Sequence, residues 1–209
     1  MMTDTAEMSR VFTFAGLGSN SLFSEQVLAL AMEDLSTLEA RVLLEACHGI
    51  FKTAFAFANG KDTFSANIDL EDFMTPESLI QPPAHYRKNS IIQHVYLYLA
   101  QLLRYMRFSK DSHSKVLGLA GFCAGLLPSA VIATTRTTTE LLSRGQDFFY
   151  VALYLGIRSE GYKQAMIRNE ACSPTLPWSV IVDGLSAQQA QELLHEHTRQ
   201  VCSLVANEI

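Results

Sequence analysis

The sequence predicts an α/β fold in which helices flank a parallel sheet. Two short apolar segments, residues 11–15 and 116–121, have the length of buried strands, and each leads into a glycine-containing turn. Between and after them, apolar residues recur every three to four positions, which is the spacing of one helix face. Strands that alternate with helices are typical of parallel sheets, because a parallel connection requires a long crossover.

The first part of the chain is expected to form a strand, a turn and two helices. Residues 11–15 alternate as a short strand, and residues 16–21 supply the glycines and capping residues of the turn after it. Apolar residues follow helical spacing over 23–57, with a break expected at 36–37. The turn-forming sequence at 59–62 should end the second helix.

The middle of the chain is expected to combine an irregular segment with a helix and the second strand. Residues 69–87 are polar and rich in proline, which predicts short helices or an irregular connection. An amphipathic helix is expected over 90–107. The strand at 116–121 then runs into a glycine-rich turn and a further helix.

A long helix is expected over residues 140–167, after a polar, β-branched run at 134–139 has ended the helix before it. Gly145 and Gly156 should interrupt or weaken the long helix, because glycine costs about 1 kcal/mol relative to alanine in a helix interior.

Pro174 and Pro177 mark the clearest boundary in the sequence, since proline ends helices and stiffens connectors. Beyond them, residues 178–182 are expected to form a strand that a turn follows. Ser186 should cap a helix over about 187–206. The C-terminal part thus has the pattern of a single strand and a single helix.

The composition argues against several classes of function. A chain of 209 residues with 48% hydrophobic content suits a globular domain, and a net charge of −5 with scattered basic residues argues against nucleic-acid binding. No apolar run reaches the length of a membrane span, and the first residues form no leader, so we expect a cytoplasmic protein without a membrane partner. The cysteines are too irregularly spaced for a disulfide framework or a zinc site, so reduced thiols and no metal are expected: Cys47, Cys123, Cys172 and Cys202.

Residues 121–125, Gly-Phe-Cys-Ala-Gly, form a G-x-C-x-G pattern between the second strand and the next helix. In such a nucleophile elbow the side chain projects from a strained strand-to-helix turn, and Gly121 and Gly125 remove Cβ atoms that would clash. A helix N-terminus next to Cys123 would favour its thiolate. The pattern predicts a catalytic Cys123, and the alternative interpretation is a small, buried hydrophobic cysteine.

Residues 116–130 closely resemble the active-site segment of the starter-unit acyl-carrier-protein transacylase domain, which opens fungal non-reducing polyketide synthases. Residues 76–83 and the helical segment 90–105 resemble the stretch that leads up to that site. Residues 11–19 are similar to the first strand and glycine-rich turn of the wider malonyl-transferase class. The resemblance is collinear and spans nearly the whole chain.

The resemblance implies that residues 8–172 form an acyltransferase-like large subdomain of α/β fold. Residues 178–209 would be the first strand and helix of a small ferredoxin-like subdomain, so the chain resembles a transacylase truncated at its C-terminus. A lone strand and helix cannot bury both of their faces, and this second unit is expected to be the less stable one.

The resemblance also implies a chemistry for the elbow. Cys123 would carry the acyl group as a thioester, and the backbone N–H groups of Leu17 and Ala124 would bind the oxyanion. Many malonyl transferases have glutamine where this chain has Leu17, but a backbone donor does not depend on the side chain. The substrates would be acyl-CoA or another acyl-thioester donor and a phosphopantetheine-bearing acyl carrier protein, with no bound cofactor.

The family's catalytic histidine is expected to be absent, because it lies beyond the small subdomain, which has barely begun here. His195 and His197 fall in the C-terminal helix, where a solvated face explains them. His94 lies in the helix before the elbow and His113 in a polar loop, so neither carries over as the base.

Arg158 is a candidate substrate-binding residue. Malonyl transferases place an arginine on the helix after the elbow, where it pairs with the free carboxylate of the substrate. Here residues 148–157 are apolar and Arg158 follows them. An apolar wall would favour an uncharged starter such as an acetyl or fatty acyl group, although apolar residues at helical spacing also form ordinary core.

Three hypotheses follow. The first is a starter-unit acyltransferase that acts through Cys123. The second is a truncated, non-catalytic fragment that is inactive alone or docks with a chain that supplies the missing half. The third, an α/β-hydrolase with a cysteine nucleophile, accounts for the elbow but not for residues 76–83.

Overall fold

The computed structural model describes residues 9–17, 22–58, 68–110 and 115–168, together with positions 186, 188, 189, 191, 192 and 195. The chain divides into two compact units, residues 1–161 and residues 162–209. The elbow and the strands predicted at 11–15 and 116–121 belong to the first unit.

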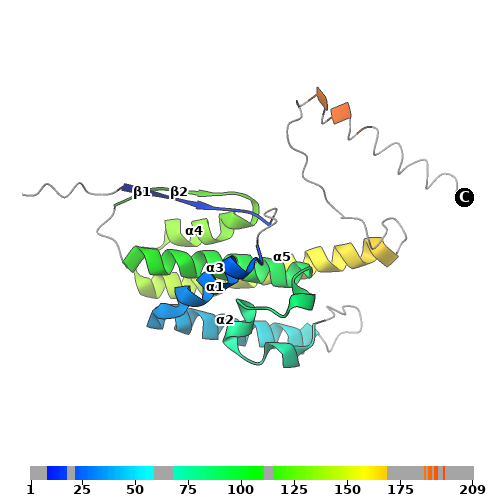
Figure 1. Cartoon of the computed structure of the whole chain (residues 1–209), viewed down its shortest axis with the longest axis horizontal. Coiled ribbons are helices and arrows are strands. Elements are labelled where there is room, and N and C mark those ends of the chain that lie inside the picture. Colours follow the sequence, from blue (N-terminus) through cyan, green and yellow to red (C-terminus); the bar gives the residue numbers. More distant parts are fainter. Residues whose placement is uncertain are drawn as a thin grey trace, which may run out of the picture. The chain divides into compact units, whose positions relative to one another are not determined.

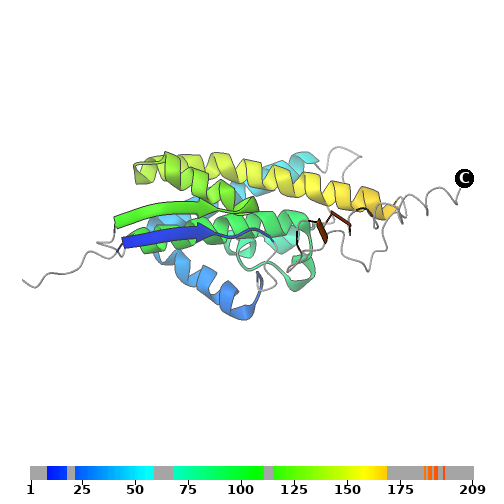
Figure 2. The ribbon, with the colours of Figure 1, turned by 90° about the horizontal axis from the view of Figure 1, so that it is seen from above.

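The sheet of the described residues has two parallel strands, β1 (Ser9–Phe14) and β2 (Lys115–Gly121). The register pairs Phe12 with Leu119 and Phe14 with Gly121, and an irregularity lies between Arg10 and Val11. Seen from above, the strands lie side by side (Figure 2). The strands predicted at 11–15 and 116–121 and their parallel arrangement are therefore confirmed.

Helices make up most of the described structure. They are α1 (Glu25–Glu33), α2 (Leu38–Ala58), α3 (Ser90–Lys110), α4 (Leu126–Thr134) and α5 (Thr138–Arg168). In the first unit the two strands lie on one side of α4 and α3, and α2 lies on the other side of α3 (Figure 1). The predicted α/β class is thus present as a small parallel sheet attached to a mainly helical unit.

The connections between these helices follow the predicted pattern. A 3₁₀ turn, η1 (Asp34–Ser36), separates α1 from α2 at the expected break, and the Thr37 hydroxyl accepts a hydrogen bond from the Ala40 N–H at 3.2 Å. The proline-rich segment forms three further 3₁₀ turns, as the expectation of short helices required: η2 (Leu70–Phe73), η3 (Pro76–Leu79) and η4 (Ala84–Tyr86).

The predicted interruption of the last long helix is wrong, because α5 is continuous through Gly145 and Gly156. A Cβ atom on Gly145 would lie 3.0 Å from a Leu43 methyl carbon, and one on Gly156 would lie 2.7 Å from the Ile91 Cα. The two glycines therefore let neighbouring helices approach α5 closely, and this packing outweighs their low helix propensity.

The predicted strand at 178–182 and the prolines before it lie outside the described residues. The Ser186 hydroxyl accepts a hydrogen bond from the Gln189 N–H at 3.3 Å, and the Gln189 side chain accepts one from the Ser186 N–H at 2.9 Å. This reciprocal pair is a capping box, so the predicted cap is confirmed. None of the helices in the described part of the chain is long and apolar enough to cross a membrane.

Candidate functional site

The backbone changes direction sharply at Cys123. Strand β2 ends at Gly121, Phe122 is extended, and a 3₁₀ turn, η5 (Cys123–Gly125), leads into α4. Cys123 has a φ of 53°, the only positive φ of a residue other than glycine among those described. Such a conformation is costly for a residue with a Cβ atom, and it is typical of functional sites.

The two flanking glycines are sterically required. A Cβ atom on Gly121 would contact the Ser129 hydroxyl and would lie 2.6 Å from the Gly125 carbonyl oxygen. A Cβ atom on Gly125 would contact the Phe14 carbonyl oxygen and would lie 2.8 Å from the Ala15 carbonyl oxygen. No side chain fits at either position unless the backbone moves.

The turn after β1 lies directly against the elbow. A Cβ atom on Gly16 would lie 2.7 Å from the Cys123 Cβ and 3.3 Å from its Sγ. The Phe122 N–H donates a hydrogen bond to the Phe14 carbonyl oxygen at 2.9 Å. The structure therefore brings together the two glycine-rich turns that the sequence singled out, and Leu17 follows Gly16 at this border.

Hydrogen bonds fix the peptide units around Ala124. The Gly125 N–H donates to the Phe122 carbonyl oxygen at 2.9 Å. The Leu126 N–H lies against the carbonyl oxygens of Ala124 and Cys123. The amide of Gly125 is therefore already engaged, whereas the role predicted for the Ala124 N–H stays a prediction.

The cysteines of the described residues differ in accessibility. Cys123 is exposed, which rules out a small, buried hydrophobic residue at this position. Cys47, on α2, is fully buried, and burial raises the pKa of its thiol far above the usual range. Cys172 and Cys202 lie outside the described residues.

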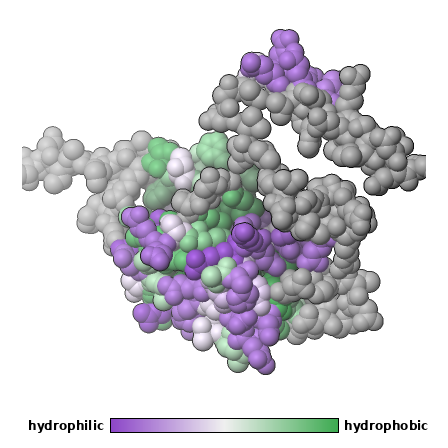
Figure 3. Space-filling model, turned by 45° about the vertical axis from the view of Figure 1, so that its right-hand side comes forward, coloured by the Kyte–Doolittle hydropathy of each residue, from purple (hydrophilic) through white to green (hydrophobic). Residues whose placement is uncertain are grey.

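Exposed apolar side chains border the elbow. Phe122 is 64% exposed and Leu126 is 57% exposed, and they lie on either side of the cysteine in sequence. On the face of the first unit that Figure 3 shows, hydrophobic surface lies above the hydrophilic surface that covers its lower part. Two residues that flank Cys123 in the sequence therefore present apolar side chains at the surface.

No histidine is paired with Cys123 among the described residues. His94, on α3, contacts the Ser90 carbonyl oxygen through Nδ1 at 2.7 Å, and burial lowers its pKa. His195 is exposed, and His113 and His197 lie outside the described residues. The structure therefore gives the predicted nucleophile no histidine base within the part that it describes.

Arg158 lies on α5 with an exposed side chain. Its predicted contact with a substrate stays a prediction, because nothing in the described residues joins it to the elbow. Within those residues, no three His, Cys, Asp or Glu side chains converge as ligands for a metal ion.

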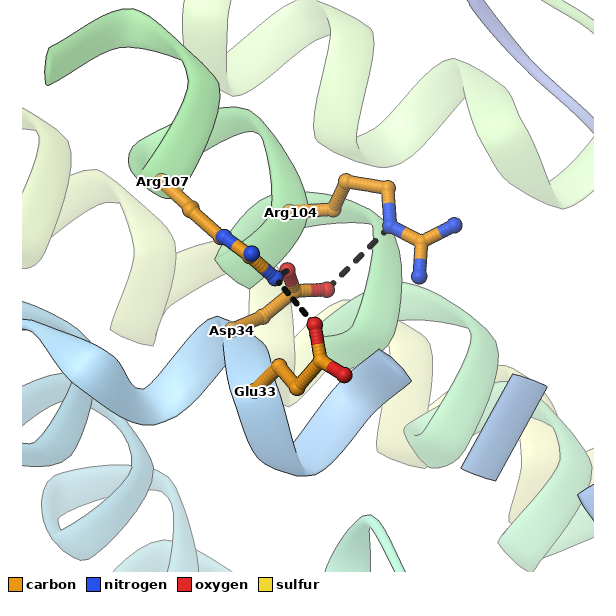
Figure 4. A network of polar contacts seen from close by, with 4 residues as sticks. All are labelled: Glu33, Asp34, Arg104 and Arg107. Carbon is orange, nitrogen blue, oxygen red and sulfur yellow. Dashed lines mark hydrogen bonds and ion pairs between the residues drawn. The ribbon is translucent and has the colours of Figure 1, made fainter. Parts of the chain in front are cut away.

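A charge cluster around the buried Asp34, which the sequence did not reveal, lies between η1 and α3. Asp34 is 1% exposed, and its carboxylate accepts hydrogen bonds from Arg104 Nε and Arg107 Nη1, both at 3.2 Å. Arg107 also donates to Glu33 at 3.0 Å (Figure 4). Arg104 and Arg107 are three residues apart and therefore lie on the same face of α3. Their spacing is compatible with binding one carboxylate, but it does not indicate which residue carries that carboxylate.

A cleft of about 470 Å³ lies away from the elbow. It is lined by residues of α1, η1, α2 and η3, among them Met32, Arg41 and Glu77. None of its lining residues comes from β1, β2 or η5. The exposed cysteine and this cleft are therefore separate features of the surface.

Comparison with known proteins identifies relatives over nearly the whole chain. Residues 40–206 match the family described as "Starter unit:ACP transacylase in aflatoxin biosynthesis". An orsellinic acid synthase of Beauveria bassiana is 41% identical over 88% of this chain, and the orsellinic acid synthase ArmB of Armillaria ostoyae is 29% identical over 87%. The chain spans only 8% and 9% of the length of these two relatives. No solved structure matches the chain.

Proposed function

Because the chain belongs to the starter-unit:ACP transacylase family, we propose that it transfers an acyl starter unit from a thioester donor to the phosphopantetheine thiol of an acyl carrier protein. The observation that carries the proposal is the exposed Cys123 at a positive φ between two glycines that tolerate no Cβ atom. The same parallel strand pair and elbow support an acyltransferase-like large subdomain for residues 8–172.

The reaction proceeds in two transfers. In the first, the Cys123 sulfur bonds to the carbonyl carbon of the donor, the donor's own C–S bond breaks, and the departing thiolate takes up the proton lost by Cys123. In the second, the pantetheine thiol attacks the Cys123 thioester, and the Cys123 thiolate leaves and takes up the pantetheine proton. Each transfer passes through a tetrahedral oxyanion.

The oxyanion is stabilised by the backbone N–H groups of Leu17 and Ala124. Support comes from the contact between Gly16 and the Cys123 side chain, because it brings the turn that contains Leu17 to the edge of the reacting thiol. Preorganised backbone donors stabilise a developing negative charge at little cost in reorganisation. The leucine side chain at this position does not alter the donor.

An uncharged acyl group is the preferred starter. Phe122 directly precedes Cys123 and Leu126 follows the elbow, and both side chains are apolar and exposed, which favours acetyl or longer acyl chains over a charged malonyl group. Arg158 would instead favour a malonyl group, if its guanidinium formed an ion pair with the free carboxylate of that substrate.

A second function is favoured by the absence of a paired histidine beside Cys123 in the described residues. In this case the chain is a non-catalytic transacylase fragment, which is inactive alone or acts with a partner chain that supplies the base. General base catalysis typically contributes about 10²- to 10⁴-fold, so the two functions differ in the rate of transfer.

The test is to incubate the wild-type chain and Cys123→Ala with acetyl-CoA, hexanoyl-CoA and malonyl-CoA, and to measure acyl adducts by peptide mass mapping. We expect an adduct on the peptide that contains Cys123, more with the uncharged donors, and none in the variant. Buried Cys47 in the same sample is the internal control. Addition of a holo carrier protein separates the two functions, since rapid transfer from Cys123 contradicts the non-catalytic fragment.

A further inference from the structure

Gln101, on α3, contacts the turn that borders Cys123. Its Nε2 donates a hydrogen bond to the Ala15 carbonyl oxygen at 2.8 Å. Ala15 directly precedes Gly16, whose Cβ position would lie 3.3 Å from the Cys123 Sγ. The Gln101 side chain therefore connects α3 to residues 15 and 16, which lie next to the thiol.

The elbow holds the same segment from the other side. A Cβ atom on Gly125 would lie 2.8 Å from the Ala15 carbonyl oxygen, so the backbones are in close contact there. The Phe122 N–H donates to the Phe14 carbonyl oxygen at 2.9 Å. Gln101 thus adds a side-chain hydrogen bond from α3 to a turn that also packs against the elbow backbone.

The other polar atom of this side chain is its carbonyl oxygen, Oε1. Gln101 Oε1 is buried and has no hydrogen-bond partner in the described part of the chain. Exchanging the amide oxygen and nitrogen would place an acceptor against the Ala15 carbonyl oxygen, so the orientation is fixed. A buried, unpaired acceptor destabilises a protein, and an apolar side chain of the same length would avoid that penalty.

We propose that Gln101 is a positioning residue for acyl transfer, which holds residues 15–17 so that the Leu17 N–H points to the oxyanion formed at Cys123. The inference rests on the proposed function and deepens it. The unpaired Oε1 of Gln101 lowers the stability of the fold, whereas its Nε2 fixes the turn beside the nucleophile. A need to hold the geometry of the transition state explains why such a side chain lies here. Small displacements of such a group lower reaction rates strongly.

The test compares two reactions of the same thiol in wild-type protein and Gln101→Met. Acylation by acetyl-CoA forms an oxyanion, whereas alkylation by iodoacetamide does not. We expect acylation of Cys123 to fall by about 10- to 100-fold, less than the 10²- to 10³-fold reported for complete removal of an oxyanion donor. Alkylation should be unchanged, and the urea midpoint should be equal or higher. Gln101→Lys, which retains an N–H donor, should recover part of the acylation rate.

Gln93→Met is the matched control, because Gln93 lies on the same helix and its Nε2 donates to the Arg87 carbonyl oxygen at 2.9 Å. It should change neither reaction. Wild-type acylation in Gln101→Met, an equal loss of both reactions, or a variant that fails to fold would each overturn the inference. A wild-type chain that is not acylated at Cys123 would instead refute the proposed function itself, and the inference with it.

Discussion

The elbow and the charge cluster around Asp34 are held together in opposite ways, although both are attached to α3. At the elbow, backbone atoms pack against glycines, and the reactive side chain is exposed. At the cluster, a buried carboxylate is held by two arginine side chains from the helix. Steric exclusion fixes the first region, and charge pairing fixes the second.

The difference indicates how each region should respond to substitution. Backbone packing leaves no freedom for an added methyl group, so a small change at the elbow alters both stability and chemistry. Charge pairs can rearrange and regain water at their exposed ends, so a change at the cluster should alter stability alone. Substitutions that separate stability from Cys123 chemistry therefore test the comparison.

The largest expected effect concerns the two thiols. Exposed Cys123 should react with iodoacetamide roughly a thousandfold or more faster than buried Cys47, because a fully buried thiol reacts only when the protein opens. Timed alkylation followed by peptide mass mapping measures the ratio. Labelling of Cys47 ahead of Cys123 in folded protein would contradict the open elbow, and the unfolded chain in urea is the control, in which the two should react alike.

The next largest effect is expected for Gly125→Ala. The added methyl group meets the Phe14 carbonyl group, which cannot rotate away, so we expect a loss of about 3 kcal/mol, the upper end of the range for overpacking. The added methyl group should push β1 away from the elbow, and this displacement should also abolish acylation of Cys123. Urea unfolding and the acylation assay measure the two changes.

Gly49→Ala is the matched control for this substitution. Gly49 lies within α2, and a Cβ atom there meets nothing within 4 Å. The change should raise the stability by about 0.5–1 kcal/mol through helix propensity and leave acylation intact. If both variants behave alike, the close contacts at the elbow do not decide its stability.

Asp34→Asn should have a smaller effect, confined to stability. We expect a loss of about 1.5 kcal/mol, the lower end for hydrogen bonds to charged groups, because the two arginines are partly exposed and regain water. Acylation and alkylation of Cys123 should not change. Glu33→Gln removes only the exposed partner of Arg107 and should change the urea midpoint less. A loss of acylation in Asp34→Asn would show that the two regions are coupled through α3.

The same contrast explains which features could be predicted from the sequence. The sharp turn at the elbow brings Gly121 against Gly125, so the spacing of Gly121, Cys123 and Gly125 reveals the turn, although not the contact of Gly125 with Phe14. Asp34 and Arg104 are 70 residues apart, and single charged residues at that separation carry no recognisable pattern. The expected break in α5 was wrong for a related reason.

The helix propensity of glycine describes only the helix that contains it, whereas the role of Gly156 depends on its contact with Ile91 of another helix. Gln101 was missed because its partner, the Ala15 carbonyl group, belongs to the backbone and leaves no mark in the sequence. Contacts between distant segments therefore limit what the pattern of residues can show, both in the fold and at the site.

The smallest expected effect is a pH dependence at His94, which lies on α3 but in neither region. Burial lowers its pKa in the folded state below the usual 6.5, although the hydrogen bond to the Ser90 carbonyl oxygen acts in the opposite direction. Below pH 6.5 the unfolded chain therefore binds a proton that the folded chain does not, and stability falls as the pH falls. His94→Asn, which retains a donor for the same carbonyl group, should lose less stability than wild type between pH 7.5 and 5.5, as measured by urea midpoints. The polar contact of His94 is with Ser90 of its own helix, so alkylation of Cys123 at constant pH should be the same in both proteins. A changed alkylation rate would mean that the N-terminal half of α3 also shapes the elbow, and the comparison would then have to include the whole helix.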